Sequence, residues 1–248
     1  MFPFFRKKEN DFTPGAALKV DMHSHLIPGI DDGAPDTETS IRLIRGLAGM
    51  GYRKVITTPH IMQGVYPNTS GIIREGLDHL KAELQNHTDL SIEIEAAAEY
   101  FMDLHFENLV EADDLLYFGK EKYVLVEMSF MAPSPNYENI LFSLFNKGYT
   151  PILAHPERYT YWHHHPEIFE RIAQMGCKLQ VNLLSLTGYY GKDVMKAGEG
   201  LVQSGLADFL GTDAHHQRHV NALINYRLVN RKLTTVLGST TFLNEQLL

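Results

Sequence analysis

The amino-acid sequence predicts an α/β fold in which seven parallel strands alternate with helices and close into a barrel. Short β-rich runs recur about every thirty to forty residues along the 248-residue chain, and a longer helix-like segment follows each run. No low-complexity linker or charge block marks a second domain. The regular spacing favours one closed barrel over an open doubly wound sheet, which remains the alternative.

The predicted strands are short and largely apolar, as expected of strands buried in a parallel sheet. They are Leu18–Met22, Lys54–Thr58, Ile92–Ala98, Tyr123–Val126, Pro151–Ala154, Lys178–Val181 and Asp208–Gly211.

Between the strands, apolar residues repeat at spacings of three and four, which places them on one face of a helix. The stripes consist of Ile41, Ile44, Leu47 and Ala48; Ile73, Leu77, Leu80 and Leu84; and Ile140, Leu141, Leu144 and Phe145. The first follows Pro35-Asp36, a helix-start signal, and the third ends at Gly148. We interpret these stripes as core faces rather than as cofactor-binding motifs.

Composition excludes several functional classes. Hydrophobic residues make up 44% of the chain and charged residues 21%, which is typical of a globular domain. The net charge of −8, from 30 acidic and 22 basic residues, argues against a nucleic-acid partner. A single cysteine excludes an internal disulfide, and no stretch has the length of an integral membrane segment. We therefore expect a cytoplasmic protein.

Residues 1–18 are expected to form an N-terminal extension, and residues 19–248 one domain. The N-terminus reads Met1-Phe2-Pro3-Phe4-Phe5-Arg6-Lys7-Lys8, with aromatic residues before the basic ones. A signal peptide requires the opposite order and a longer apolar run. Weak peripheral membrane attachment is the alternative interpretation of this segment.

Side chains that bind metal ions occur at the carboxyl ends of six of the seven predicted strands. They are His23, His25, Asp32, His60, Glu99, Glu127, His155, Asp213 and His215. In a parallel barrel these ends form one face, where active sites gather. A His-x-His pair on an extended segment points both rings to the same side.

Nine such groups are too many for one tetrahedral ion, and Glu127 could bridge two ions. A nitrogen and oxygen set without thiolate fits Mn, Fe, Zn or similar ions, among which the residues do not choose. Any one buried His or Glu is more simply a satisfied core group. The clustering favours the metal interpretation, because unpaired buried carboxylates are costly.

Two arginines follow candidate ligands: Arg158 comes after His155, and Arg218 after His215. A guanidinium group can bind phosphate oxygens in bidentate fashion, so we predict that both contact a phosphate group. The alternative for each is a surface salt bridge.

Other residues near the candidate ligands have competing interpretations. Tyr159, Tyr161 and Trp162 could pack against an aromatic substrate or only against the rim of the barrel, and the sequence leaves this open. Cys177 has no arginine at the spacing that cysteine-based phosphatases use, so we predict a buried structural residue. The run His163–His165 before Pro166 is interpreted as a solvated helix start without a catalytic role.

Taken together, these motifs resemble the PHP (polymerase and histidinol phosphatase) superfamily. Within it, they are most similar to the bacterial protein-tyrosine phosphatases of the CpsB/CapC/YwqE type. The resemblance runs from about Lys19 to the last helix. It rests on Asp21-Met22-His23-Ser24-His25, Asp31-Asp32-Gly33, Thr58-Pro59-His60, Ala98-Glu99, Val126-Glu127-Met128-Ser129, Ala154-His155-Pro156-Glu157-Arg158-Tyr159 and Thr212-Asp213-Ala214-His215.

The resemblance implies a distorted TIM-like (β/α)7 barrel of the PHP type that holds two to three divalent ions. Manganese is the first expectation, with Fe, Zn, Co or Mg as alternatives. It assigns the same nine ligands, and Arg158 and Arg218 to the phosphate.

The implied activity is hydrolysis of phosphotyrosine by a metal-bound hydroxide. The implied partner is the tyrosine-rich tail of a bacterial tyrosine kinase of capsule or exopolysaccharide synthesis. Two alternatives remain: a phosphatase for histidinol phosphate or another small phosphomonoester, and a non-catalytic PHP binding module.

Overall fold

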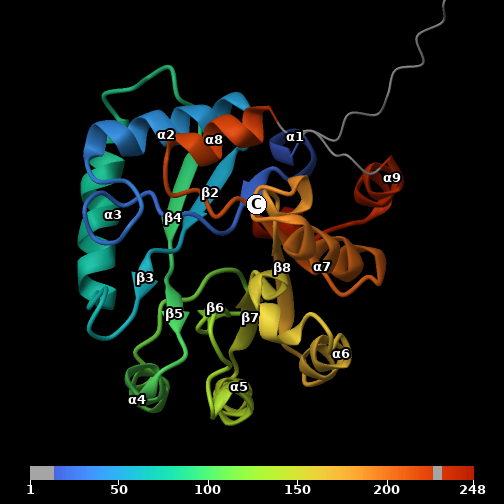
Figure 1. Cartoon of the computed structure of the whole chain (residues 1–248). Coiled ribbons are helices and arrows are strands. Elements are labelled where there is room, and N and C mark those ends of the chain that lie inside the picture. The colour runs from blue at the N-terminus through green and yellow to red at the C-terminus, as the bar shows by residue number, and fades with distance from the viewer. Residues whose placement is uncertain (1–13, 226–230) are drawn as a thin grey trace, which may run out of the picture.

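The computed structural model describes residues 14–225 and 231–248 of the chain (Figure 1). Most of the expected N-terminal extension, residues 1–13, lies outside the described residues. The remainder, Pro14–Leu18, forms the short helix α1, and Leu18 is buried in the core. The described fold therefore includes the last residues of the predicted extension.

Strands occupy the centre of the molecule and helices its outside (Figure 1). The strands are β1 (Val20–Asp21), β2 (Lys54–Thr57), β3 (His60–Ile61), β4 (Glu93–Ala96), β5 (Glu99–Phe101), β6 (Tyr123–Glu127), β7 (Thr150–Ala154), β8 (Lys178–Asn182) and β9 (Phe209–Gly211). The α-helices after α1 are α2 (Thr37–Gly49), α3 (Ser70–Leu84), α4 (Leu104–Ala112), α5 (Tyr137–Asn146), α6 (Glu167–Gln174), α7 (Lys192–Gln203), α8 (Gln217–Ile224) and α9 (Arg231–Ser239). Short 3₁₀ helices are η1 (Pro156–Arg158), η2 (Thr160–Trp162), η3 (Ser185–Thr187) and η4 (Leu243–Leu247).

The strands pair in parallel in two sheets, with the orders β1-β2-β4 and β3-β5-β6-β7-β8-β9. Each of the seven predicted strand regions contains a strand, and the parallel α/β architecture is confirmed. The pairing is divided between two sheets because two runs of the chain are interrupted, and closure into one barrel stays a prediction.

The interruptions separate β2 from β3 at Thr58-Pro59 and β4 from β5 at Ala97-Ala98. Proline lacks an N–H group and cannot donate to the ladder, which explains the first break. Backbone hydrogen bonds still join the two runs, from Ala97 N to Thr57 O and from Glu99 N to Pro59 O. As a result, His60 and Glu99 begin second strand segments instead of ending the first ones.

Hydrogen bonds join β9 to β1 across the boundary between the two sheets. The Asn244 amide donates to Val20 O (3.0 Å) and Leu210 O (2.8 Å), and its oxygen accepts from Leu210 N (3.0 Å). Buried Asp21 accepts from the backbone N–H and the hydroxyl of Thr212. These side chains connect neighbouring strands where a regular ladder is absent.

The three predicted apolar stripes fall on helices α2, α3 and α5 and face the core. Their buried members are Ile41, Ile44, Leu47, Ile73, Leu80, Ile140, Leu141 and Leu144. The predicted helix start is also confirmed, since the Asp36 carboxylate caps α2 by accepting from Thr39 N at 2.8 Å. Helix α5 ends before Gly148, whose positive φ of 80° suits glycine.

Among the described helices, none has both the length and the apolar character that crossing a membrane requires.

The role of Asn244 can be tested by mutation. Asn244→Ala should lower the free energy of unfolding by roughly 2–4 kcal/mol, because it leaves buried backbone groups of Val20 and Leu210 without partners. Urea denaturation measures the change. The control is Asn139→Ala, an exposed position on α5, which should change stability by less than about 0.5 kcal/mol. Equal effects at the two positions would show that Asn244 does not join the strands.

Candidate metal centre

All nine predicted ligands lie together in one cluster. They form four overlapping groups whose ligand atoms lie within 4.8 Å of one another: His25, Asp32, His60 and His215; His23, His155 and Asp213; His23, His25 and Glu99; and His60, Glu99 and Glu127. Four residues belong to two groups each, so neighbouring ions would share ligands. This arrangement suits a multinuclear centre rather than one isolated ion.

Glu99 occupies the middle of the cluster and is completely buried. Its Oε2 atom lies 3.2 Å from His23 Nε2, 3.4 Å from His25 Nε2 and 3.2 Å from His60 Nδ1. Despite these neighbours, Oε2 has no well-aligned hydrogen-bond partner among the described residues. Several donor atoms converging on an unsatisfied buried carboxylate oxygen fit a shared divalent cation.

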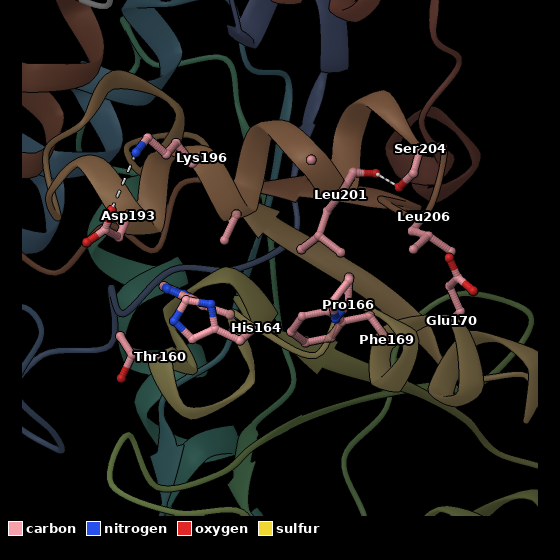
Figure 2. Close-up of a pocket in the computed structure, with 13 residues that line it drawn as sticks. Thr160, His164, Pro166, Phe169, Glu170, Asp193, Lys196, Leu201, Ser204 and Leu206 are labelled. Carbon is pink, nitrogen blue, oxygen red and sulfur yellow. Dashed lines mark hydrogen bonds and ion pairs between the residues drawn. The ribbon is translucent and has the colours of Figure 1, made fainter.

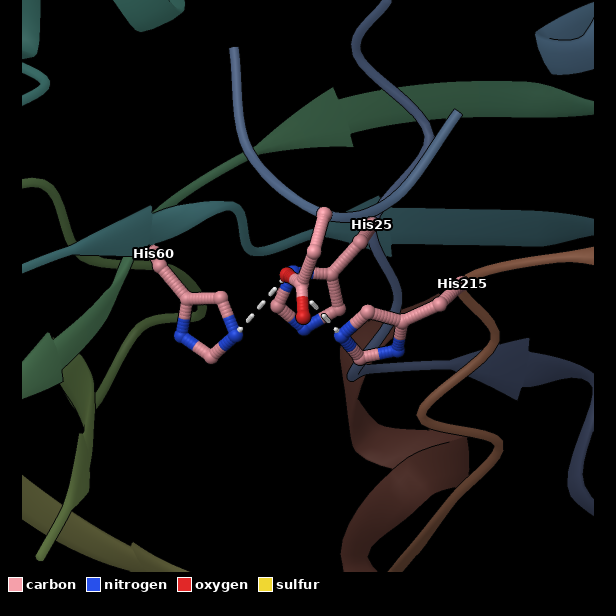
Figure 3. Close-up of side chains that lie close together, drawn as sticks. His25, His60 and His215 are labelled. Atoms are coloured by element: carbon pink, nitrogen blue, oxygen red, sulfur yellow. Dashed lines mark ion pairs between the residues drawn. The ribbon is translucent and has the colours of Figure 1, made fainter. Parts of the chain in front are cut away.

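The outermost group is the one that faces solvent. Figure 3 shows the rings of His60 and His215 on either side of His25. Asp32 Oδ1 lies 3.5 Å from both His60 Nε2 and His215 Nε2, and the Asp32 side chain is 52% exposed. An ion held here would be the most accessible to substrate.

Hydrogen bonds behind the ligands orient the imidazole rings. His23 Nδ1 donates to Gln180 Oε1 at 2.8 Å, and His25 Nδ1 donates to Asp31 Oδ2 at the same distance. These bonds leave each Nε2 atom free to bind an ion, as is usual for metal-binding histidines.

Asp213 is anchored through one of its two oxygens. Asn182 Nδ2 donates to Asp213 Oδ2 at 2.7 Å, and Arg158 Nη1 donates to the same atom at 3.1 Å. The other oxygen, Oδ1, lies 3.3–3.6 Å from nitrogens of His23, His25 and His215. One oxygen therefore faces the candidate metal site while the other is held by the protein.

Sequence reasoning missed Gln180 and Asn182, which lie on β8. A signal was present: polar residues occupy alternate positions of a buried strand and so share one face. That face points towards the cluster, where the two amides support His23 and Asp213.

Burial and neighbouring charges shift the pKa values of His23 and His60 in opposite directions. Burial of His23 and His60 disfavours their protonation, yet the charge of Glu99 together with its acidic neighbours raises the pKa of each to about 10. For His215, burial and the neighbouring His25 lower the pKa to about 4. The carboxylates thus create a negative field that attracts positive charge, which divalent cations would supply.

Two of the predicted ligands have strained backbone conformations. His155 (φ 35°) and Asp213 (φ 50°) adopt left-handed conformations that residues other than glycine rarely occupy. Each costs roughly 1–3 kcal/mol, and such strain is concentrated at functional sites. Gly33 lies in a crowded position, because a Cβ atom there would lie 2.2 Å from His25 O. The Asp31-Asp32-Gly33 motif therefore needs its glycine to bring two carboxylates beside His25.

The cluster opens into a cavity of about 250 Å³. The predicted ligands that line it are Asp32, His60, Glu127, His155, Asp213 and His215. Arg158 also lines it, as predicted for a phosphate contact, but Arg218 is exposed on α8 and is not among the described lining residues. The lining includes four residues that the sequence did not indicate, namely Phe130, Tyr190, His216 and His219.

The aromatic residues after His155 pack against the rim. Tyr159 is fully buried and Trp162 is 6% exposed, so neither presents a ring to the cavity. The Tyr159 hydroxyl accepts from Met128 N (3.0 Å), and the Tyr161 hydroxyl donates to Ser129 O (3.1 Å). They hold the loop that follows β6, and Phe130 on that loop reaches the cavity instead.

A family model for capsular polysaccharide synthesis proteins, CpsB/CapC, matches residues 19–243 of the chain. The chain belongs to the CpsB/CapC family. It is 32% identical to the tyrosine-protein phosphatase YwqE of Bacillus subtilis over 207 residues, which cover 82% of this chain and 79% of YwqE. It is 26% identical to the putative tyrosine-protein phosphatase CapC of Staphylococcus aureus, covering 86% of this chain and 84% of CapC.

Solved structures share the fold of this chain. One from work on YwqE of Bacillus subtilis and CpsB of Streptococcus pneumoniae, described as unique metal-dependent tyrosine phosphatases, superposes with a TM-score of 0.75. Its sequence is 28% identical, and the match covers 90% of this chain and 96% of that one. Histidinol phosphate phosphatase from Lactococcus lactis matches with a TM-score of 0.56 at 14% identity, covering 90% and 95% of the two chains, which shows a shared fold.

A larger cavity, of about 670 Å³, lies between α6 and α7 and contains none of the predicted ligands. Figure 2 shows Phe169 and Leu201 facing each other across it. His163 and His164 lie at its edge, directly before α6 as the sequence predicted. His163 Nε2 donates to Glu157 O at 2.7 Å, so this residue supports the segment that carries Arg158.

Proposed function

We propose that this CpsB/CapC chain is a metal-dependent protein-tyrosine phosphatase. The observation that carries the proposal is a cluster of nine candidate nitrogen and oxygen ligands that opens into a cavity lined also by one partly exposed arginine. The named activity of YwqE and the related solved structure support it. The carboxylate-rich surroundings would repel a phosphate group unless cations reversed the local field.

Each part of the site has a role in this proposal. Divalent ions held by the nine ligands would supply an activated water and neutralise phosphate charge. Arg158 donates one N–H group to Asp213 and has further in-plane donors for phosphate oxygens. A phenolate leaving group has a conjugate acid of pKa about 10, so the site needs no assigned general acid for phosphotyrosine.

The finer features belong to the same proposal. The overlapping ligand groups support two to three ions, for which we propose manganese, with Fe, Zn, Co and Mg as alternatives. We propose that the two sheets together form a distorted seven-stranded barrel. The proposed substrate is the tyrosine-rich tail of a bacterial tyrosine kinase of capsule or exopolysaccharide synthesis, encountered in the cytoplasm.

Metal dependence is the direct test of the proposed function. Incubation with a strong chelator should abolish phosphatase activity, and Mn²⁺ or a similar ion should restore it. Thiol alkylation should leave activity unchanged, because Cys177 is buried and burial raises the pKa of its thiol to about 12. Activity that survives chelation and disappears on alkylation would contradict the metal mechanism.

The two arginines should differ in importance. Arg158→Ala should lower kcat/KM by about 10- to 100-fold, because a charge-assisted phosphate contact is worth roughly 1.5–3 kcal/mol. Arg218→Ala is the matched control and should have little effect, since its side chain does not line the cavity. Metal analysis of the same samples separates loss of phosphate binding from loss of ions at Asp213. An equal loss at both positions would give Arg218 the phosphate-binding role that the sequence indicated.

Substrate preference tests the choice of leaving group. Phosphotyrosine peptides should be hydrolysed with a higher kcat/KM than phosphoserine peptides or histidinol phosphate, because phenolate leaves without protonation and phosphotyrosine reaches further into a recessed cavity. Steady-state kinetics on these three substrates measures the order. A clear advantage for histidinol phosphate would favour a small-molecule phosphatase with the same metal centre.

A further inference from the structure

The guanidinium group of Arg158 lies between two aromatic rings. Its central carbon is 4.4 Å from the centroid of the Phe130 ring and 4.5 Å from that of the Tyr190 ring. Both distances are well within the range of cation–π contacts. All three residues line the candidate metal cavity.

The order of the strands explains how these side chains meet. Phe130 follows β6, Arg158 follows β7 and Tyr190 follows β8, and β6, β7 and β8 are neighbours in the six-stranded sheet. Adjacent strands lie about 4.8 Å apart, close to the stacking distance of flat side chains. Residues on three successive loops can therefore stack in the order of their strands.

Both rings are themselves held in place. The backbone directly before Phe130 is held, since Met128 N donates to the Tyr159 hydroxyl and Ser129 O accepts from the Tyr161 hydroxyl. Tyr190 makes an edge contact with Tyr189, at 5.0 Å between ring centroids. The rings can therefore restrain the arginine rather than follow it.

Contact with the two rings limits the directions in which the guanidinium group of Arg158 can bind an anion. A guanidinium group donates only in its plane, so a ring packed on either face would block no donor. Its one hydrogen bond to another described residue goes from Nη1 to Asp213 Oδ2. The remaining donors have no partner among the described residues, and the side chain is 24% exposed. Rings on the faces and Asp213 at one edge would hold these donors ready for an anion.

We propose that Phe130 and Tyr190 are positioning residues that hold Arg158 in its phosphate-binding orientation. This inference rests on the proposed function and deepens it, because it concerns how the same cavity recognises the phosphate group. An arginine free to rotate would have to be ordered each time a phosphate bound, at a cost in side-chain entropy.

The test is a double-mutant cycle on the metal-loaded protein. The variants are Phe130→Leu, Tyr190→Leu and Arg158→Ala, singly and with each leucine variant combined with Arg158→Ala. Two quantities are measured: the affinity for inorganic phosphate by calorimetry, and kcat and KM for para-nitrophenyl phosphate. Metal content is determined for every sample.

Each leucine variant should weaken phosphate binding and lower kcat/KM by about three- to thirtyfold, the effect expected from loss of one cation–π contact. In the Arg158→Ala background the same changes should cost less than about twofold, since the residue they position is gone. Tyr190→Phe and Phe130→Tyr keep the rings and should retain most of the affinity. Phe142→Leu, at an exposed position on α5, is the control and should change nothing.

Equal losses with and without Arg158 would overturn the inference, because the rings would then act on the substrate or on the fold directly. Unchanged phosphate affinity in the single leucine variants would also overturn it. The calorimetric measurement needs no turnover, so a wild-type protein that binds phosphate but hydrolyses no phosphoester would contradict only the proposed function. A wild-type protein that does not bind phosphate would contradict both.

Discussion

The burial of several carboxylates at one point is the constraint on which the site depends. Glu99 is fully buried, and Glu127 and Asp213 lie close by with almost no exposure. Removing one carboxylate from water is costly unless positive charge accompanies it, and three together require more than hydrogen bonds. The surrounding imidazoles of His23, His25 and His60 supply some of this charge when protonated. Divalent cations would supply it more fully, so the same repulsion that destabilises the cluster gives it affinity for metal.

The backbone is adapted to this cluster at several places. Breaks at Thr58-Pro59 and Ala97-Ala98 allow His60 and Glu99 to start new strand segments, β3 and β5, beside each other. Left-handed backbone at His155 and Asp213 turns two further candidate ligands into the cluster. An uninterrupted barrel with relaxed strand ends would not direct the same side chains to one point. The strand pairing is interrupted, or the backbone strained, at the positions where candidate ligands turn into the cluster.

The sequence predicted which residues form the candidate metal cluster better than it predicted the residues that support or surround them. The ligands stand out because His, Asp and Glu are rare at the ends of apolar strands, and parallel strands bring those ends together. Gln180 and Asn182 are single amides on a strand, and the residue type alone does not show which side chain each amide contacts. The burial of Tyr159 depends on how the loops after β6 and β7 pack, which local patterns do not encode. On helix α8, the sequence did not predict which side chains reach the cavity. Each residue turns by about 100°, so the exposed Arg218 and the cavity-lining His219 are neighbours in sequence with opposite surroundings.

The position of Asn244 in the chain has a consequence for the order of events during synthesis. This residue joins β1, which leads into His23, to β9, which leads into Asp213. It is translated after all nine candidate ligands. The strands that lead into the first and last groups of candidate ligands therefore lack this connection until Asn244 has been made. A nascent chain would contain these histidines and carboxylates before Asn244 could join the two strands, so stable loading with metal would follow the synthesis of Asn244.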